Sequence, residues 1–361
     1  MIATALSLSF LVPIGTAFAG TTYWPSPWNG IKVYLSPAKH SPDNTGCDSF
    51  SENTEARDNA LKAKDWLYSY NYAVRVGDGD YTQNTSDSNN WGSDVHIPIH
   101  SNAGTWDCTS PYDYSNGGTW TMYASTNGRK LATKILYRMD GESPGTNDRV
   151  GTDVELSGKH LYELRYTNAV AAYVEAAFHT FGPDEDWLRL NSTVGTLVAR
   201  GIDDYFGNPR CGVSVTCIQS IGDPVARSVG ATAKVADAAP RGRLATTSPR
   251  NELGSAPDLD EALEELLVRE FGLSPSMLQT AELAGDGTAV VDFSAVLPEV
   301  IPNASTSAGS ASLLGSLNAT VFQFPEVERV IYSLDGDCEA FWGWLQSACD
   351  PVERQDWEGR K

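Results

Sequence analysis

The sequence is poor in positive charge. Lysine and arginine number 26 against 46 aspartates and glutamates, so the formal net charge of the 361 residues is -20 at pH 7. Proteins that bind nucleic acid carry basic patches, and anionic membrane surfaces also attract basic segments. The composition therefore argues against nucleic acid and against an anionic membrane as partners.

The sequence also lacks any Cys-x-x-Cys pair, which argues against a zinc site built from thiolates. Six cysteines are present, and an even count in an exported chain indicates disulfides. Cys211 with Cys217, and Cys338 with Cys349, would close short loops and are the expected pairs. Cys47 and Cys108 remain and could pair within the first domain.

Long apolar runs are missing as well. Residues 1–19 (MIATALSLSFLVPIGTAFA) are apolar but short for a membrane span, and Pro13 and Gly15 interrupt them. They end in Ala-Phe-Ala before Gly20, which is typical of a secretory signal with a small-residue cleavage site, although the usual positively charged start is missing. The prediction is a secreted protein, and the alternative is a buried first strand.

The chain length suggests two domains. In the first, residues 31–210, short apolar runs alternate with amphipathic helices, which predicts an α/β fold with a mostly parallel sheet flanked by helices. The strands are expected at 31–35, 72–76, 95–99 and 169–174, and the helices at 55–70, 130–139 and 194–205.

Residues 222–257 are rich in Ala, Pro, Arg, Ser and Thr and are predicted to be a linker. A small α+β domain is expected at 258–346, followed by a C-terminal tail at 347–361. Its first helix begins with a capping-box-like Asp258 and Glu261 and ends at Gly272. Its other elements are expected to be strands at 288–294 and 329–336 and a helix at 310–324.

Histidine is scarce, with five in the chain: His40, His96, His100, His160 and His179. Two of them lie four apart in DVHIPIHSNAG (94–104), where β-branched isoleucines and Pro98 favour a strand over a helix. At roughly 3.3 Å per residue, His96 and His100 are then about 13 Å apart. Zn–N bonds are only about 2 Å long, so one ion cannot hold both, and the other ligands must come from elsewhere.

The candidate ligands stand at element ends. His40 follows the first strand and His100 ends another, which are the positions where open α/β sheets bind ligands. Glu55 opens the first long helix, and Glu175 lies at a third strand end. Two imidazoles and a carboxylate form a zinc site that keeps a fourth position for water, and a further carboxylate nearby can act as a base.

Residues 31–207 resemble the zinc-dependent N-acetylmuramoyl-L-alanine amidases, particularly those of spore-forming and filamentous Gram-positive bacteria. The matching stretches are LSPAKH, ENTEARDNALKAKDWL, SDSNNWGSDVHIPIHSNAG, GGTWTMYAS, LYELRYTNAVAAYVEAAFH and DEDWLRLNSTVGTLVARGIDDYFG. The resemblance implies Zn²⁺ held by His40, Glu55 and His100, with Glu175 as the catalytic carboxylate. Glu52 competes with Glu55, which is preferred because Asn59 and Ala60 follow it at the family's spacing.

The resemblance further implies a peptidoglycan hydrolase in the extracellular cell wall of a Gram-positive bacterium, which cleaves the amide between N-acetylmuramic acid and L-alanine. In this family the zinc activates a water molecule. Many members carry Asp-Pro-Gly-His-Gly at the first ligand, whereas SPAKH (36–40) is one residue longer. Two alternatives stay open: a zinc peptidase that cuts within the stem peptide, and an inactive wall-binding module that has lost the metal.

Residues 258–346 resemble the sporulation and germination domain called GerMN. The matching stretches are LDEALEELLVREFGLS, GTAVVDFS, LNATVFQFPEVERVIYSLDG and CEAFWGWLQ. No catalytic signature occurs among them. The resemblance implies a wall or protein partner for this domain.

Overall fold

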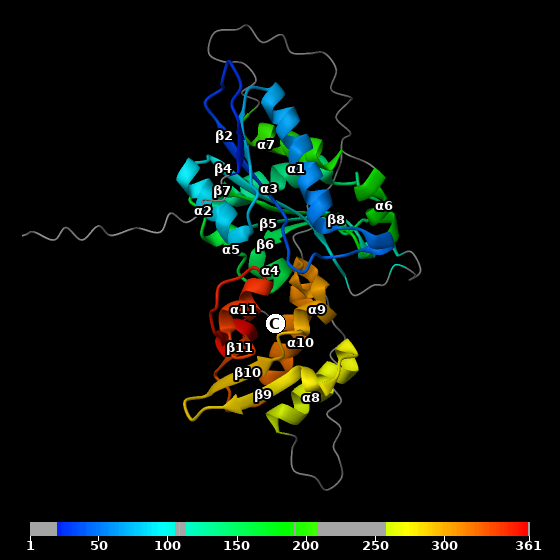
Figure 1. Ribbon diagram of the computed structural model, residues 1–361, viewed down its shortest axis with the longest axis vertical. Helices are drawn as coiled ribbons and strands as arrows, with labels where there is room; N and C mark the ends of the chain where they lie inside the picture. The colour runs from blue at the N-terminus through cyan, green and yellow to red at the C-terminus, as the bar shows by residue number, and fades with distance from the viewer. Residues whose placement is uncertain (1–19, 105–107, 109–112, 191–192, 208–257, 360–361) are drawn as a thin grey trace, which may run out of the picture.

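The computed structural model describes residues 20–104, 108, 113–190, 193–207 and 258–359. The described residues form two domains, one drawn from blue to green and the other from yellow to red (Figure 1). The signal-like segment 1–19, the predicted pair Cys211–Cys217 and the predicted linker 222–257 lie outside these residues.

The first domain is built on an eight-stranded sheet. The pairs β1–β3 and β5–β8 are antiparallel and the other pairs are parallel, so the prediction of a mostly parallel sheet is confirmed. In spatial order the strands are β1 (Thr21–Tyr23), β3 (Ala73–Val76), β2 (Lys32–Pro37), β4 (Val95–Asn102), β8 (Tyr173–Phe178), β5 (Trp120–Tyr123) and β6 (Arg149–Thr152), with β7 (Val170–Ala171) also paired to β4.

Three helices cover one face of this sheet: α1 (Glu52–Ser69), α3 (Thr126–Met139) and α7 (Val194–Tyr205). They bury the apolar side of β4, where Val95, Ile97 and Ile99 join the main core. The alternation predicted for β4 is thus confirmed, because His96 and His100 point to the opposite face. The remaining helices of the domain are α2 (Tyr81–Trp91), α4 (Asp153–Ser157), α5 (Tyr162–Arg165), α6 (Gly182–Leu190) and the 3-10 turns η1 (Cys47–Ser49) and η2 (Tyr114–Asn116).

The opposite face of the sheet carries a second apolar cluster that includes Trp120, Met122, Tyr173 and Phe178. Residues of α4 and α5 pack on it, and so does Ala308 of the second domain. Figure 1 shows the second domain beneath this face, with α4 at the boundary. Ala308 of the second domain therefore adds to this apolar cluster.

The second domain is an α+β unit, as the sequence predicts, but it runs past the predicted end at residue 346. A strand at Val352–Glu353 and a helix at Arg354–Glu358 lie within the predicted tail and pack on the core of this domain. Its four-stranded sheet has the order β12 (Val352–Glu353), β11 (Arg329–Leu334), β10 (Thr288–Phe293) and β9 (Leu278–Leu283). Asp258 caps the first helix and the left-handed Gly272 ends it, as the sequence predicts. The helices are α8 (Leu259–Phe271), α9 (Leu297–Val300), α10 (Ser307–Val321), α11 (Cys338–Trp344), α12 (Arg354–Glu358) and the 3-10 turns η3 (Pro275–Met277) and η4 (Pro302–Ser305).

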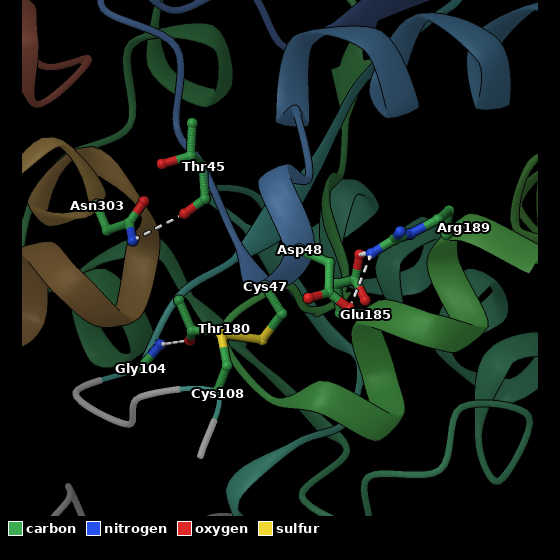
Figure 2. Close-up of a disulfide and its surroundings, with 9 residues drawn as sticks. All are labelled: Thr45, Cys47, Asp48, Gly104, Cys108, Thr180, Glu185, Arg189 and Asn303. Carbon is green, nitrogen blue, oxygen red and sulfur yellow. Dashed lines mark hydrogen bonds and ion pairs between the residues drawn. A yellow bond between two sulfur atoms is a disulfide. The ribbon is translucent and has the colours of Figure 1, made fainter. Parts of the chain in front are cut away.

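Two of the predicted disulfides are present among the described residues. Cys338 and Cys349 are joined with a Cα–Cα distance of 5.7 Å, and Cys47 and Cys108 with one of 5.5 Å. Figure 2 shows the second bond beneath the loop that leads into α1. It ties that loop to the chain segment that follows β4.

Candidate metal centre

Parallel pairing of β2 with β4 brings two histidines together at the carboxyl ends of these strands. The register joins Pro37 to Ile99, and His40 and His100 follow within a few residues. The side chain of Asn53, at the start of α1, makes two hydrogen bonds with the backbone of His40. The His40 backbone N–H donates to the Asn53 side chain (2.7 Å), and that side chain donates to the His40 carbonyl (2.9 Å).

His40, Glu52 and His100 form the one cluster in the described residues whose donor atoms could share a metal ion. His40 Nε2 lies 3.3 Å from His100 Nδ1 and 3.3 Å from Glu52 Oε2, and His100 Nδ1 lies 2.9 Å from Glu52 Oε1. Ligands placed tetrahedrally around zinc at about 2 Å are about 3.3 Å from one another. The donor set and its spacing therefore fit a tetrahedral zinc ion with one position left over.

The carboxylate of this cluster is Glu52, not Glu55. Helix α1 begins at Glu52, with Ser51 as its N-cap, so Glu52 lies beside the loop that carries His40. Three residues further on, Glu55 has moved about 4.5 Å along the axis, and its carboxylate accepts a hydrogen bond from Asn59 (2.9 Å). The structure thus brings Glu52, the competitor, and not the expected Glu55 to the two histidines.

Glu52 is held as an anion. Asn44 donates to Oε2 (2.7 Å) and the Ser101 backbone N–H donates to Oε1 (3.0 Å). Burial alone would raise the pKa of Glu52, but the imidazoles of His40 and His100 hold it well below its ordinary value. Burial also lowers the pKa of His100, which favours the neutral imidazole that a metal requires.

Glu175 lies next to this cluster. In the β4–β8 register it is the partner of His100, so both side chains project from the same face on adjacent strands. Its side chain is buried, and burial followed by the negative charge of Glu52 raises its pKa to about 8. Its Oε1 accepts a hydrogen bond from the backbone N–H of Ser307, a residue of the second domain (3.2 Å).

His96 lies away from the cluster, as the strand geometry predicts. Its Nε2 is 2.9 Å from Glu163 Oε1, and its ring stacks on Tyr34 with centroids 5.2 Å apart. The same Glu163 oxygen accepts from the Ser36 hydroxyl (2.5 Å). His96 therefore belongs to a buried polar network beneath the metal cluster.

The other two histidines and Arg165 do not join the cluster either. His179 Nδ1 is 2.9 Å from the Ser101 hydroxyl, and His160 is an exposed side chain 3.8 Å from Asp153. Arg165 makes a two-pronged ion pair with Asp153, at 2.7 and 2.5 Å. Their contacts are structural.

A cavity of about 310 Å³ opens beside His40 and His100. Its lining comes from both domains. The first domain supplies Ser36, Pro37, Ala38, Lys39, Ser41, Pro42, Asp80, Tyr81 and Glu163 as well as the two histidines, and the second supplies Pro298, Ser305, Ala340, Gly343, Trp344 and Gln346. Glu175 is not among its lining residues, and one of its oxygens accepts the Ser307 N–H of the second domain.

The sequence of residues 33–204 matches the family described as N-acetylmuramoyl-L-alanine amidase, and this match covers just under half of the chain. A search of curated proteins gave no match. No helix in the described part of the chain is long and apolar enough to cross a membrane.

Several solved structures are similar to the first domain. They include the N-acetylmuramoyl-L-alanine amidase AmiC2 of Nostoc punctiforme (14% identity, 49% of this chain and 97% of that one, TM-score 0.42). The catalytic domain of the amidase CwlV from Bacillus (Paenibacillus) polymyxa var. colistinus is 19% identical, over 49% of this chain and 98% of that one, with a TM-score of 0.41. The CwlD amidase from Clostridioides difficile, solved in complex with the GerS lipoprotein, is 16% identical over 49% and 98%, with a TM-score of 0.42.

Proposed function

We propose that residues 33–204, a domain of the N-acetylmuramoyl-L-alanine amidase family, use a zinc ion held by His40, Glu52 and His100 and use Glu175 as the base. On this family match we infer that the protein is a peptidoglycan hydrolase that cleaves the amide between N-acetylmuramic acid and L-alanine. The observation that supports the metal is the spacing of three buried donors at the separations that a tetrahedral ion requires.

The ion would supply a Lewis acid that polarises the amide carbonyl and acidifies a water molecule. Asn44 and the Ser101 N–H hold Glu52 in place as a ligand by donating to its two oxygens. Tyr173 stacks on the His100 ring, with centroids 4.5 Å apart, and fixes its orientation. These residues preorganise the ligand set before the substrate binds.

In this proposal Glu175 moves the proton. It takes a proton from the attacking water and passes it to the amide nitrogen as the carbon–nitrogen bond breaks. The products are the lactyl carboxylate on the sugar and the free amino group of L-alanine. A carboxylate with a raised pKa suits both halves of this transfer, because it can accept the proton and then release it near neutral pH.

We infer that the enzyme acts on the wall outside the cytoplasm, since disulfides persist in oxidising compartments. The GerMN-like character of residues 258–346, a spore-forming Gram-positive source and removal of a signal at 1–19 stay predictions. The second domain contributes no residue to the metal cluster.

Mass spectrometry of digested peptidoglycan tests the proposal. An amidase releases intact stem peptides whose L-alanine amino group is free and leaves unsubstituted lactyl groups on the glycan. Cleavage between two amino acids would show a peptidase on the same scaffold. Zinc well below one ion per chain in the purified protein, together with no released product, would indicate a wall-binding module.

A further inference from the structure

The second domain places the start of α10 on the catalytic carboxylate. The Ser307 backbone N–H donates to Glu175 Oε1 (3.2 Å), and the Ala308 N–H donates to the side chain of Asn102 on β4 (2.9 Å). Both donors belong to the first turn of a 15-residue helix, whose free N–H groups and dipole attract negative charge. The other oxygen of Glu175 is buried and has no hydrogen-bond partner in the described residues.

The residues just before α10 fasten this turn to the rim of the site. Ser305 donates to Asn44 (2.9 Å), the same side chain that holds Glu52. Figure 2 shows Asn303 pointing at Thr45, to whose carbonyl it donates (3.1 Å), on the loop that the Cys47–Cys108 bond anchors. The second domain is therefore joined to the loop that connects His40 to Glu52.

A buried lysine of the first domain adds two further hydrogen bonds. Lys159 donates to the Ser305 carbonyl (3.1 Å) and to the Ser310 hydroxyl (2.6 Å). Burial lowers the pKa of Lys159 to about 7. A buried amine that is left without partners is unfavourable, so these two bonds tie Lys159 to the docked position of α10.

This position conflicts with catalysis. A general base must lie within about 3 Å of the water that it deprotonates, and the substrate carbonyl must lie next to that water. The Ser307 nitrogen already occupies hydrogen-bond distance from Glu175, and the cavity beside the histidines does not reach this carboxylate. A glycan strand with its peptide cannot lie over Glu175 while the turn is there.

We propose that the second domain holds the amidase in a closed, inactive state, in which residues 305–308 occupy the place of the scissile amide beside Glu175. The enzyme acts after this turn has moved away. The inference rests on the proposed function, because it assigns Glu175 the role of base.

A disulfide across the interface tests this directly. A Cβ built on Gly158, the residue that ends α4, would lie 3.9 Å from Ala311 Cβ on α10, within the usual range for bonded cysteines, and 3.3 Å from Ala311 Cα. Gly158 is left-handed (φ 73°), so the single Gly158→Cys variant measures the cost of that strain. Full-length protein with Gly158→Cys and Ala311→Cys should lose at least tenfold of its hydrolysis of a soluble muramyl-peptide fragment when oxidised, and should recover it on reduction. Binding of the same fragment, measured by calorimetry, should fall and recover in parallel. The single-cysteine variants and the wild-type protein, treated identically, control for the native disulfides.

A loosening variant gives the opposite test. Ala308→Glu places a carboxylate against the second apolar cluster and near Glu175, and should raise hydrolysis at least tenfold. Ala319→Glu makes the same change at an exposed position of the same helix and should leave hydrolysis unchanged.

The outcomes separate the possibilities. If the oxidised double-cysteine protein still binds and cleaves the fragment as the reduced protein does, the closed state is refuted while the amidase proposal stands. If Ala308→Glu loses hydrolysis while the oxidised double-cysteine protein keeps it, then α10 completes the active site instead of blocking it. If no form, reduced or oxidised, binds or cleaves the fragment, the proposed function fails and this inference fails with it.

Discussion

Replacing Glu52 with Gln should remove zinc, whereas replacing Glu55 with Gln should not. The change at Glu52 keeps the shape of the side chain but removes the negative charge of the ligand. Both carboxylate oxygens accept hydrogen bonds, from Asn44 and from the Ser101 N–H, so the NH₂ group of a glutamine would face a donor where an acceptor is needed. Losing a residue that only supports a ligand costs 10–100-fold in metal affinity, so losing the ligand itself should cost more than about 100-fold, or about 2.7 kcal/mol.

The matched change at Glu55 should be nearly silent. Glu55 is partly exposed and accepts one side-chain hydrogen bond, from Asn59 within the same helix. Burial raises the pKa of Glu55, so an uncharged Gln is well tolerated there, and the free energy of unfolding should change by no more than about 0.5 kcal/mol.

The assay is zinc content by elemental analysis after dialysis, followed by competition with a chelator of known affinity. Circular dichroism establishes that both variants are folded. Zinc retained by Glu52→Gln and lost by Glu55→Gln would refute the ligand set and restore the assignment that the sequence alone favours. Equal zinc loss in both would mean that the start of α1 is rearranged when the metal binds.

Three further outcomes are expected. Glu175→Gln should keep its zinc and lower release of L-alanine amino groups by about 10²–10⁴-fold, because only proton transfer is lost; near-normal turnover would contradict its role as base. His100→Ala should lose zinc and activity while His96→Ala keeps zinc in the same elemental analysis, and equal loss in both would contradict the strand geometry. Removing the Cys47–Cys108 bond, which closes a 61-residue separation, should destabilise the first domain by about 4 kcal/mol in thermal or denaturant unfolding, and an unchanged midpoint would show that the loop is held by its other contacts.

Elements with a clear apolar period could be predicted from the sequence. Helix α1 places Ala56, Ala60, Ala63 and Leu67 on its buried side, and β4 alternates as expected. Helix α2 carries no such period, because its sequence YTQNTSDSNNW is polar throughout. It is stabilised at its ends instead, by a capping box at Asp80 and by a left-handed Gly92.

The two histidines of the cluster could be predicted because each follows a strand of a parallel sheet. The choice between Glu52 and Glu55 could not, since both are acids in the first turn of the same helix. What decides it is where the helix begins: the side chain of Ser51 caps α1 by accepting from Thr54, which leaves Glu52 as its first residue, beside the histidines. A helix start is uncertain by a residue or two from sequence, and here that uncertainty is enough to change which acid lies beside the histidines.

The contact between α10 and Glu175 could not be predicted from the sequence, for a different reason. Residues 303–308 read NASTSA, and such a run of small polar residues is typical of any helix start, where side chains satisfy free N–H groups. Thr306 caps α10 in this ordinary way. Yet small side chains also let the backbone approach a buried surface closely, and two N–H groups of this turn find partners in the other domain, Glu175 and Asn102, 132 and 206 residues away in sequence. The same residues would serve equally well at a helix start in water, and it is their contacts with the other domain, such as the packing of Ala308 against the second apolar cluster, that distinguish the two uses.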